Sequence, residues 1–508
     1  MISPWFLLPL LSLLSLLCPS LGAKPFSPSR FPSQNLGSLR PSADGHGSSS
    51  RGWETKYYTQ TLDHFNYHPE SYVTFRQKYL INAEHWGGAA GAAPIFVYTG
   101  NEGPIEVFAK NTGLMFDIAP KFGALLVFIE HRYYGTSIPF GSGALENATT
   151  AGYLSTSQAL ADFATLIVHL KRNLTAQKSP VVVFGGSYGG MLAAWFRLKY
   201  PEVAIGALAS SAPILQIDPN FNPFVFTSII TNNFKSTSEN CYRVIKNSWD
   251  EIDRAVASNT GKEKMEKLLK LCKGGAESAK DWIDEALTYV SMTDYPTPSN
   301  FLQPLPAYPV KQMCKAIDNP TTGNDTFAKL YGAMNIYYNY TGAAGECFNT
   351  SVSATERIDS DAWSWQTCTE IFLPTGANNN ESMFQPSTGT NLEWMTELCY
   401  YYYYVKPRFF WLTTEFGASS IKTALKKFGS NIIFYNGLKD PWSGGGVLKS
   451  ISKTLVAIVA PKGAHHVDLR ASTRDDPKWL QDLRTSEVQI IKKWIRQYYR
   501  DNSISSSI

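Results

Sequence analysis

The stretch VVVFGGSYGGMLAAWF, from Val181 to Phe196, interrupts an apolar run with two pairs of glycines around Ser187 and Tyr188, and then continues with helix-forming residues. A GxSxG motif between a strand and a helix is typical of a nucleophile elbow, a sharp turn that exposes a serine hydroxyl. The glycines allow the strained backbone and the close contact of strand and helix that such a turn needs. A glycine-rich turn with an incidental serine is the alternative, so the flanking sequence has to decide.

The flanking sequence alternates short apolar runs with helical patterns. The runs fall at 94–98, 124–130, 180–184, 204–209, 431–435 and 454–459. Continuous apolar runs are typical of strands buried on both faces of a parallel sheet. Residues 157–172 carry Leu160, Phe163, Ile167 and Leu170 at helical spacing, which predicts a crossover helix. Together with the elbow, this pattern predicts an α/β-hydrolase fold with a mainly parallel central sheet.

The middle of the chain has a different character. After about Pro213 the pattern changes to longer amphipathic helices, such as Cys241–Ala257, mixed with polar loops. All the cysteines except Cys18 fall in this zone. We therefore expect an inserted, disulfide-stapled helical cap at 214–425, between a first part of the hydrolase core at 53–213 and a second part at 426–508.

The first 23 residues indicate export. An apolar run from Trp5 to Leu17 precedes small residues that end at Ala23, as in a cleaved secretory signal peptide at 1–23. Residues 24–52 are rich in Ser, Pro and Gly, which predicts a disordered leader or propeptide. No later stretch is long and apolar enough to span a membrane, so we expect a protein of the secretory pathway. Candidate N-glycosylation sites agree with that route: Asn147, Asn173, Asn324, Asn339, Asn349 and Asn380.

Charge and metal-binding patterns exclude several classes of function. The net charge is +4 over 508 residues without a block of Lys and Arg, which argues against binding to nucleic acid or to anionic membranes. No CxxC occurs, and His64 and His68 have no glutamate between them, so no metal or other cofactor is expected. Without Cys18 the cysteines number six, an even set that predicts three disulfides in one of about 15 connectivities.

A serine nucleophile needs a histidine base, and the histidines restrict the choice. In this fold the acid and then the histidine follow the serine along the chain. Of the eight histidines only two follow Ser187, and these are His465 and His466, directly after the run at 454–459. The others precede it: His46, His64, His68, His85, His131 and His169. The base is therefore expected at His465 or His466.

The acid of the triad is expected at the end of the preceding strand. Asp440 lies just after the run at 431–435 and 25 residues before His465 (465 − 440). Its expected role is to hold the imidazole tautomer and to stabilise the imidazolium. Asp468 and Glu415 are competitors, but Asp468 follows the histidines and Glu415 does not end an evident strand.

An oxyanion hole requires backbone donors. The N–H of Tyr188, directly after the nucleophile, is one candidate. The other is the N–H of Gly103 in the loop Asn101-Glu102-Gly103-Pro104, which follows the early strand at 94–98. A simple turn explains this loop equally well from the residues alone.

These motifs are similar, in order, to those of the lysosomal Pro-X carboxypeptidase (prolyl carboxypeptidase) and dipeptidyl peptidase II family of serine peptidases. The matching segments are LDHF (62–65), YTGNEG (98–103), EHRYYG (130–135), GGSYGGMLAAWFRLKYP (185–201), SNFLQPLPAYPVKQMC (299–314), NGLKDPWSGGG (436–446) and GAHHVDLR (463–470). The resemblance covers the chain from about Tyr57 onward. It implies an exopeptidase that removes the residue after proline at a peptide's C-terminus, in a lysosomal, vacuolar or extracellular setting.

The resemblance also implies roles for particular residues. It places the nucleophile at Ser187, the acid at Asp440 and the base at the first histidine of the pair, His465. It implies the disulfides Cys241–Cys314, Cys272–Cys347 and Cys368–Cys399. The substrates that the resemblance implies are peptides with proline next to the terminal residue. A homodimer is compatible with the resemblance.

A proline pocket needs apolar and aromatic walls, for which Met191, Trp442 and the Tyr400–Tyr404 run are candidates. Most of those five tyrosines are expected instead on a half-buried cap segment with their hydroxyls in water. More distant serine carboxypeptidases place a glutamate before the nucleophile to bind the terminal carboxylate, whereas Gly186 stands here. The candidates for reading the peptide end are Asn101, Glu102, Arg132 and His466.

Three other functions are compatible with the same residues. The nearest is a dipeptidyl peptidase that releases X-Pro from the N-terminus. An acyltransferase or esterase could use the same triad, and a non-catalytic glycoprotein could retain the fold.

Overall fold

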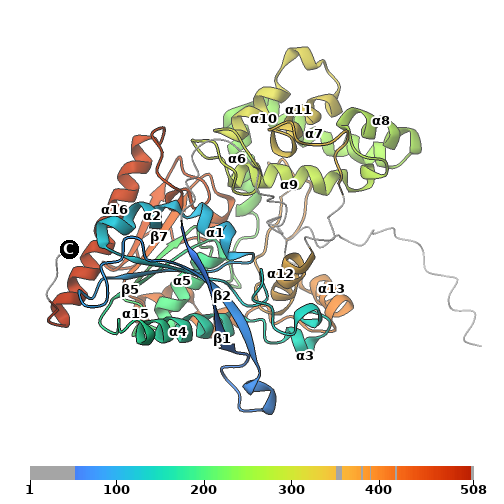
Figure 1. Ribbon diagram of the computed structural model, residues 1–508. Coiled ribbons are helices and arrows are strands. Elements are labelled where there is room, and N and C mark those ends of the chain that lie inside the picture. Colours follow the sequence, from blue (N-terminus) through green and yellow to red (C-terminus); the bar gives the residue numbers. More distant parts are fainter. Residues whose placement is uncertain (1–51, 351–356, 379–380, 390, 418–419, 505–508) are drawn as a thin grey trace, which may run out of the picture.

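The computed structural model describes residues 52–350, 357–378, 381–389, 391–417 and 420–504 (Figure 1). The expected signal peptide at 1–23, almost all of the leader at 24–52 and the glycosylation site Asn380 lie outside the described residues.

An eight-stranded sheet forms the centre of the molecule. Its strand order is β1-β2-β4-β3-β5-β6-β7-β8; β1 and β2 are antiparallel, and the six strands from β4 to β8 across the sheet are parallel. The strands are β1 (Glu54–Thr61), β2 (Thr74–Asn82), β3 (Ile95–Thr99), β4 (Leu125–Ile129), β5 (Val181–Gly186), β6 (Gly206–Ser210), β7 (Ile432–Gly437) and β8 (Leu455–Ala460). The mainly parallel sheet predicted from the apolar runs is confirmed, and each of the six runs forms a strand.

The edge hairpin of β1 and β2 was not among the expected strands. β1 has the sequence ETKYYTQT and is exposed over most of its length. In β2, buried residues are interspersed with exposed and half-buried ones. A strand that lies at a sheet edge needs no continuous apolar run, because one of its faces stays in water. The polar sequence of β1 therefore carries only a weak strand signal.

Helices cover both faces of the sheet (Figure 1). On one face, α1 (Ile105–Asn111), α2 (Gly113–Phe122) and α16 (Lys478–Asp501) pack on side chains such as Phe96 and Phe184. On the other face, α4 (Thr156–Asn173) and α5 (Tyr188–Lys199) pack on alternate residues such as Val97 and Val183. The two cores on opposite faces fix the positions at which the parallel strands end.

Between β6 and β7 the chain forms an inserted helical cap in two groups (Figure 1). The larger group contains α6 (Val225–Thr237), α7 (Glu239–Val256), α8 (Asn259–Leu269), α9 (Ala279–Met292), α10 (Pro309–Ile317) and α11 (Thr326–Tyr338). The smaller contains α12 (Arg357–Thr369) and α13 (Leu392–Tyr403), and in Figure 1 it lies near α3 (Ala148–Ala151). Three disulfides staple this region, in the same pairs that the family resemblance implies: Cys241–Cys314, Cys272–Cys347 and Cys368–Cys399.

The expected boundary at residue 425, between the cap and the second part of the core, falls inside α15 (Ile421–Phe428). The preceding helix α14 (Trp411–Gly417) stacks Phe416 on Trp195 of α5, with 4.5 Å between ring centroids. Ile421 and Leu425 of α15 belong to the same apolar cluster as α5. We therefore propose that the insertion ends before Trp411.

Two further features concern the described helices and the candidate glycosylation sites. Among the described helices, none combines the length and apolar character that crossing a bilayer requires. The described glycosylation candidates are accessible to water: Asn147, Asn173, Asn324 and Asn349 are exposed, and Asn339 is half-buried.

Candidate active site

Ser187 occupies a strained turn between β5 and α5. Its backbone has φ 58° and ψ −128°, a conformation that few residues other than glycine adopt. Its N–H donates to the carbonyl of Ser210 at the end of β6 (2.9 Å). A Cβ on Gly185 would lie 2.0 Å from the carbonyl oxygen of Gly189, so only glycine permits this approach of strand and helix. This is the geometry of a nucleophile elbow.

Asn101 supports the elbow through hydrogen bonds of its side-chain amide. Its Nδ2 donates to the carbonyl of Gly186 (2.6 Å), and its Oδ1 accepts from the hydroxyl of Tyr98 (2.8 Å). A Cβ on Gly189 would collide with Oδ1 at 2.2 Å. Asn101 does not line the pocket beside Ser187, in contrast to the sequence-based expectation. Because both ends of its amide are occupied within the fold, it positions the elbow.

Asp440 and His465 form a buried hydrogen-bonded pair. The Oδ2 of Asp440, just after β7, lies 2.7 Å from the Nδ1 of His465, which follows β8, and neither side chain is exposed. Oδ1 of Asp440 accepts from the N–H of Trp442 (3.0 Å), which fixes the carboxylate plane. With the proton held on Nδ1 towards the carboxylate, Nε2 is the nitrogen that can accept a proton. This Nε2 is buried and has no hydrogen-bond partner among the described residues.

The loop of His465 lies against the end of β5. The N–H of His466 donates to the Oγ of Ser211 (2.8 Å), and a Cβ on Gly186 would lie 3.0 Å from the His466 ring. The structure therefore brings the histidine loop to the residue directly before Ser187. The hydrogen bond between Ser187 and His465 is not formed in this structure, and such bonds commonly tighten only when substrate binds.

The two competing acids have other partners. Asp468 accepts from the Oγ of Ser210 (2.5 Å), and Glu415 on α14 forms an ion pair with Lys199. Among the described residues it is Asp440, and neither of these two acids, that is hydrogen-bonded to the His465 ring. Of the acids considered, the geometry favours Asp440.

The cap holds the backbone of His465. Its N–H donates to the carbonyl of Met292 at the end of α9 (3.0 Å), and its carbonyl accepts from the hydroxyl of Tyr295 (2.9 Å). The Nζ of Lys439, beside the triad acid, forms an ion pair with Asp294 (2.6 Å). Residues 292–295 of the cap therefore contact both catalytic loops, and we call them the cap clamp.

The two expected oxyanion donors differ in availability. Tyr188 is the first residue of α5, so its N–H has no acceptor within the helix. The N–H of Gly103, in contrast, donates to the carbonyl of Asn101 (3.0 Å). Gly103 can serve an oxyanion only if this bond is shared or exchanged when substrate binds.

A narrow, mainly apolar pocket adjoins Ser187. Of the candidate pocket residues, Met191, Trp442 and Glu102 line it, whereas Asn101 and His466 do not. The remaining walls are Tyr188, Pro213, Tyr289, Met292, Trp363, Thr367, Ile371, Leu373 and Thr375. Most of these come from the cap, and no motif identifies them, because their position depends on how the insertion docks.

His466, Arg132 and the tyrosine run do not contact this pocket. Burial and the neighbouring His465 hold the pKa of His466 well below its usual range, and its ring packs on Phe301 (5.0 Å). Arg132 makes five hydrogen bonds inside the fold, two of them to Asp162, so the guanidinium has no N–H left for a peptide end. Four tyrosines of the 400–404 run are exposed, as expected for a cap segment, while Tyr403 packs on Trp365.

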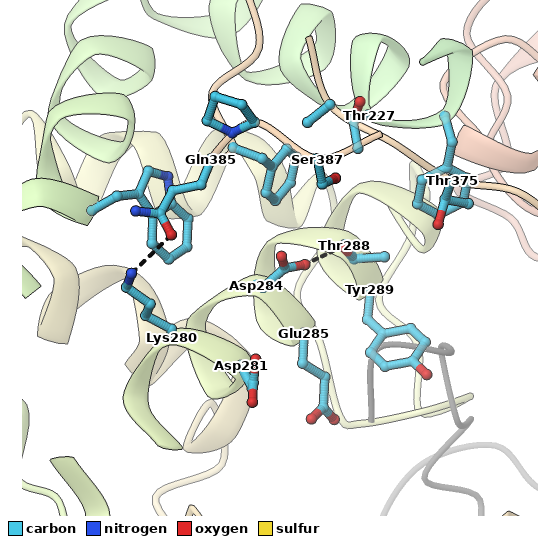
Figure 2. Close-up of a pocket in the computed structure, with 15 residues that line it drawn as sticks. Thr227, Lys280, Asp281, Asp284, Glu285, Thr288, Tyr289, Thr375, Gln385 and Ser387 are labelled. Carbon is cyan, nitrogen blue, oxygen red and sulfur yellow. Dashed lines mark hydrogen bonds between the residues drawn. The ribbon is translucent and has the colours of Figure 1, made fainter. Parts of the chain in front are cut away.

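A second cavity of 190 Å³ adjoins the pocket and is acidic (Figure 2). Tyr289 and Thr375 line both spaces, so the two are neighbours. Asp281, Asp284 and Glu285 of α9 line the second cavity, and Figure 2 shows Asp284 hydrogen-bonded to Thr288 (3.3 Å). The acidic cavity therefore borders the pocket that contains Ser187.

Several buried ionisable groups lie near the site. Burial raises the pKa of Glu102 to about 7, and burial raises the pKa of Asp468 to about 7. Burial and the charge of Asp468 hold the pKa of Glu487 well above its usual range. In the opposite sense, burial lowers the pKa of His131 to about 4, and the pKa of His466 is also low. Each of these groups favours its neutral form in the fold.

We expect stability to be greatest at mildly acidic pH. Above pH 6.5 the unfolded carboxyls are all ionised while the folded ones still hold protons, so stability falls as pH rises through 7. Glu102 and Asp468 together account for a loss of ~1.5 kcal/mol between pH 6.5 and 8. Below pH 6.5 the folded carboxyls continue to gain stability as pH falls, and protonation of His131 and His466 in the unfolded chain increasingly opposes this gain.

The measurement is the melting temperature by calorimetry from pH 4 to pH 9 at constant ionic strength. A maximum between about pH 5 and 6.5 is expected, with a clear fall by pH 8. A melting temperature that rises between pH 6.5 and 8 would contradict the assignment of neutral buried carboxyls.

The sheet order, the strained elbow serine and the Asp-His pair at the ends of β7 and β8 define an α/β-hydrolase. Residues 60–487 match the family Serine carboxypeptidase S28. The chain is 43% identical over 501 residues to the lysosomal Pro-X carboxypeptidase of Bos taurus, covering 97% of this chain and 98% of that protein. It is 42% identical over 456 residues to the Homo sapiens protein of that name, covering 89% and 90%. The chain belongs to the serine carboxypeptidase S28 family.

The chain also has more distant similarities. The thymus-specific serine protease of Homo sapiens is 27% identical over 464 residues, with 86% of each chain covered. Among solved structures, a proline iminopeptidase of Mycobacterium smegmatis is 11% identical with a TM-score of 0.39, covering 87% of this chain and 98% of that one.

Proposed function

We propose that the protein is a serine exopeptidase that cleaves Pro-X bonds at the C-terminus of peptides. The observation that carries the proposal is the buried 2.7 Å hydrogen bond between Asp440 and His465, whose loop lies against the elbow of Ser187. The 42–43% identity to proteins named Pro-X carboxypeptidase supports the substrate class.

In the proposed reaction, Nε2 of His465 takes the proton of Ser187 as its Oγ attacks the carbonyl carbon of the proline residue. The N–H of Tyr188, with that of Gly103 once it is released from Asn101, stabilises the negative oxygen of the tetrahedral intermediate. The imidazolium then protonates the amine of the departing C-terminal residue, and an acyl-enzyme remains. Water, deprotonated by the same Nε2, attacks the ester and restores Ser187.

The pocket beside Ser187 fits a proline ring. Met191 and Trp442 present apolar surface, and Trp442 is held in place by an edge-to-face contact with Phe226 (4.7 Å). Trp363 closes the pocket from the cap side and packs on the Tyr188 ring (5.4 Å). A proline side chain has no polar group to satisfy, so the apolar surfaces of Met191, Trp442 and Trp363 suit it.

The proposed cellular setting is the secretory pathway, ending in a lysosomal, vacuolar or extracellular compartment. Three disulfides suit an oxidising compartment. The neutral buried carboxyls make the fold suited to mild acid, and the named relatives are lysosomal.

One observation favours a second candidate, a dipeptidyl peptidase. The amine of an N-terminal X-Pro substrate would lie one residue beyond the proline pocket. The acidic cavity of Asp281, Asp284 and Glu285 borders that pocket through Tyr289 and Thr375 (Figure 2). Such a cavity can bind an ammonium group.

Two matched peptides separate the candidates. One has a blocked N-terminus and ends in Pro-Phe with a free carboxylate; the other begins with a free-amine Ala-Pro dipeptide and is amidated at its C-terminus. We expect release of phenylalanine from the first and no release of Ala-Pro from the second, both read by mass spectrometry. Release of Ala-Pro alone would replace the proposal with the dipeptidyl reaction, and turnover of simple esters without cleavage of either peptide would indicate an esterase.

A further inference from the structure

Glu102 is a buried carboxyl that the mechanism above does not use. It lines the pocket that contains Ser187, and the residue is only 6% exposed. Its Oε2 has no hydrogen-bond partner among the described residues. A buried carboxyl oxygen without a partner is costly, which is a reason to look for a ligand group that completes it.

Glu102 lies close to the elbow, because it lines the same pocket as Ser187. It is the residue directly before Gly103 and directly after Asn101, whose amide holds the carbonyl of Gly186 in the elbow (2.6 Å). The leaving residue of a carboxypeptidase carries its free carboxylate only one residue beyond the scissile carbonyl. A group at this position is therefore within reach of that carboxylate.

The pocket offers no cation to this carboxylate. Among the described residues that line it there is no lysine, arginine or histidine. Arg132, the arginine considered from the sequence, is fully engaged by Asp162 and by backbone carbonyls. A carboxylate in this pocket must therefore be bound by neutral donors.

Glu102 can be such a donor in acid. Burial raises its pKa to about 7, although its own backbone N–H and the Asn101 amide lower it in part. The titratable groups that interact with it are Tyr98 of β3, Tyr188 of α5 and Tyr289 of α9. Burial raises the pKa of all three tyrosines above the usual range, so they stay neutral across the pH range of interest.

We propose that Glu102, as a neutral carboxylic acid, donates a hydrogen bond from its unpartnered oxygen to the C-terminal carboxylate of the peptide. This inference rests on the proposed carboxypeptidase function and names the residue that reads the chain end. A hydrogen bond between a carboxylic acid and a carboxylate is charge-assisted and therefore strong in a water-poor pocket. An ionised Glu102 would instead repel the substrate.

The sign of the pH dependence follows from this. Below pH 7 Glu102 is neutral and binds the carboxylate; above pH 7 the neutral fraction falls about tenfold per pH unit. A C-terminal amide carries no charge and can also accept or donate to either form of Glu102. The preference for free acid over amide should therefore disappear with rising pH, independently of the titration of His465.

The test compares two N-blocked peptides that end in Pro-Phe, one as the free acid and one as the amide. For the wild-type enzyme, the ratio of kcat/KM for acid to amide should fall about tenfold from pH 5 to pH 8. For Glu102→Gln, whose amide donates at every pH, the ratio should change less than about twofold. For Glu102→Ala the ratio at pH 5 should fall ~10- to 100-fold, because a hydrogen bond to a charged group is lost.

Glu106→Gln is the matched control. It makes the same carboxyl-to-amide change four residues further on, in the first turn of α1, where Glu106 pairs with Lys78 (3.0 Å) and does not line the pocket. Its acid-to-amide ratio should follow the wild-type pH profile.

The outcomes separate this inference from the proposed function. If the wild-type enzyme releases neither phenylalanine from the acid nor phenylalanine amide from the amide at any pH, the carboxypeptidase function itself fails. If it does so but Glu102→Gln retains the wild-type pH profile of the ratio, the role of Glu102 is overturned.

If the Glu102 variants do not fold, inhibition of the wild-type enzyme decides instead. An analogue with a reduced Pro-Phe bond should lose affinity about tenfold from pH 5 to pH 8 as the free acid, but not as the amide. Equal pH dependence of the two inhibition constants would overturn the proposal.

Discussion

Replacement of Ser187 by alanine is expected to lower kcat/KM for a blocked Pro-Phe peptide by ~10⁴-fold or more. The hydroxyl is the proposed nucleophile, and no other described group lies at the elbow to replace it. The residue adopts φ 58°, a strain that serine and alanine share, so the variant should fold with an almost unchanged melting temperature. The measurements are steady-state kinetics and labelling by a fluorophosphonate, which should be lost.

Ser179→Ala is the matched control for this variant. Ser179 is fully buried, and its hydroxyl has no hydrogen-bond partner among the described residues. It lies just before β5, at the opposite end of the strand from Ser187. Its activity should remain within about twofold of wild type. If Ser187→Ala kept substantial peptidase activity, the assignment of the nucleophile would be wrong.

The second large effect is expected for Asp440→Asn, which should lower kcat by about 10⁴-fold. Oδ1 of Asp440 accepts from the N–H of Trp442, so the carbonyl oxygen of the new amide should keep this contact. The amide NH₂ then faces Nδ1 of His465 and forces that nitrogen to be the acceptor. The imidazole proton moves to Nε2, where it prevents the histidine from accepting the proton of Ser187.

Asp468→Asn distinguishes this effect from a general loss of buried charge. Asp468 was the competing acid in the sequence, and its carboxyl contacts Ser210 and not the ring of His465. Its loss should reduce kcat less than about tenfold, although the pH dependence of stability should become flatter. Equal losses in the two variants would argue that the two acids cannot be told apart by their contacts.

The sequence was sufficient for the parts of this molecule that depend on local pattern and chain order. Apolar runs buried on both faces of the sheet predict β3 to β8, because such runs have few other stable environments. The elbow is predicted by the glycines around Ser187, because the sharp strand-to-helix turn leaves no room for larger side chains there. Chain order alone leaves His465 and His466 as the histidines downstream of Ser187.

The rest depends on packing that no local pattern encodes. Asn101 and Arg132 are polar residues in the matching motifs, and they could read a peptide end as well as support the fold. Only their contacts show that both are used internally, by Gly186 and by Asp162. The pocket walls Tyr289 and Trp363 come from helices of the insertion, whose docking is a tertiary property.

The cap clamp makes catalytic competence a late event in the life of the chain. Both backbone groups of His465 bond to the insertion, through Met292 and Tyr295. A molecule whose insertion is misfolded, reduced or nicked therefore has every triad residue but no aligned base. We expect such a molecule to stay inactive until its insertion has folded and docked on the core.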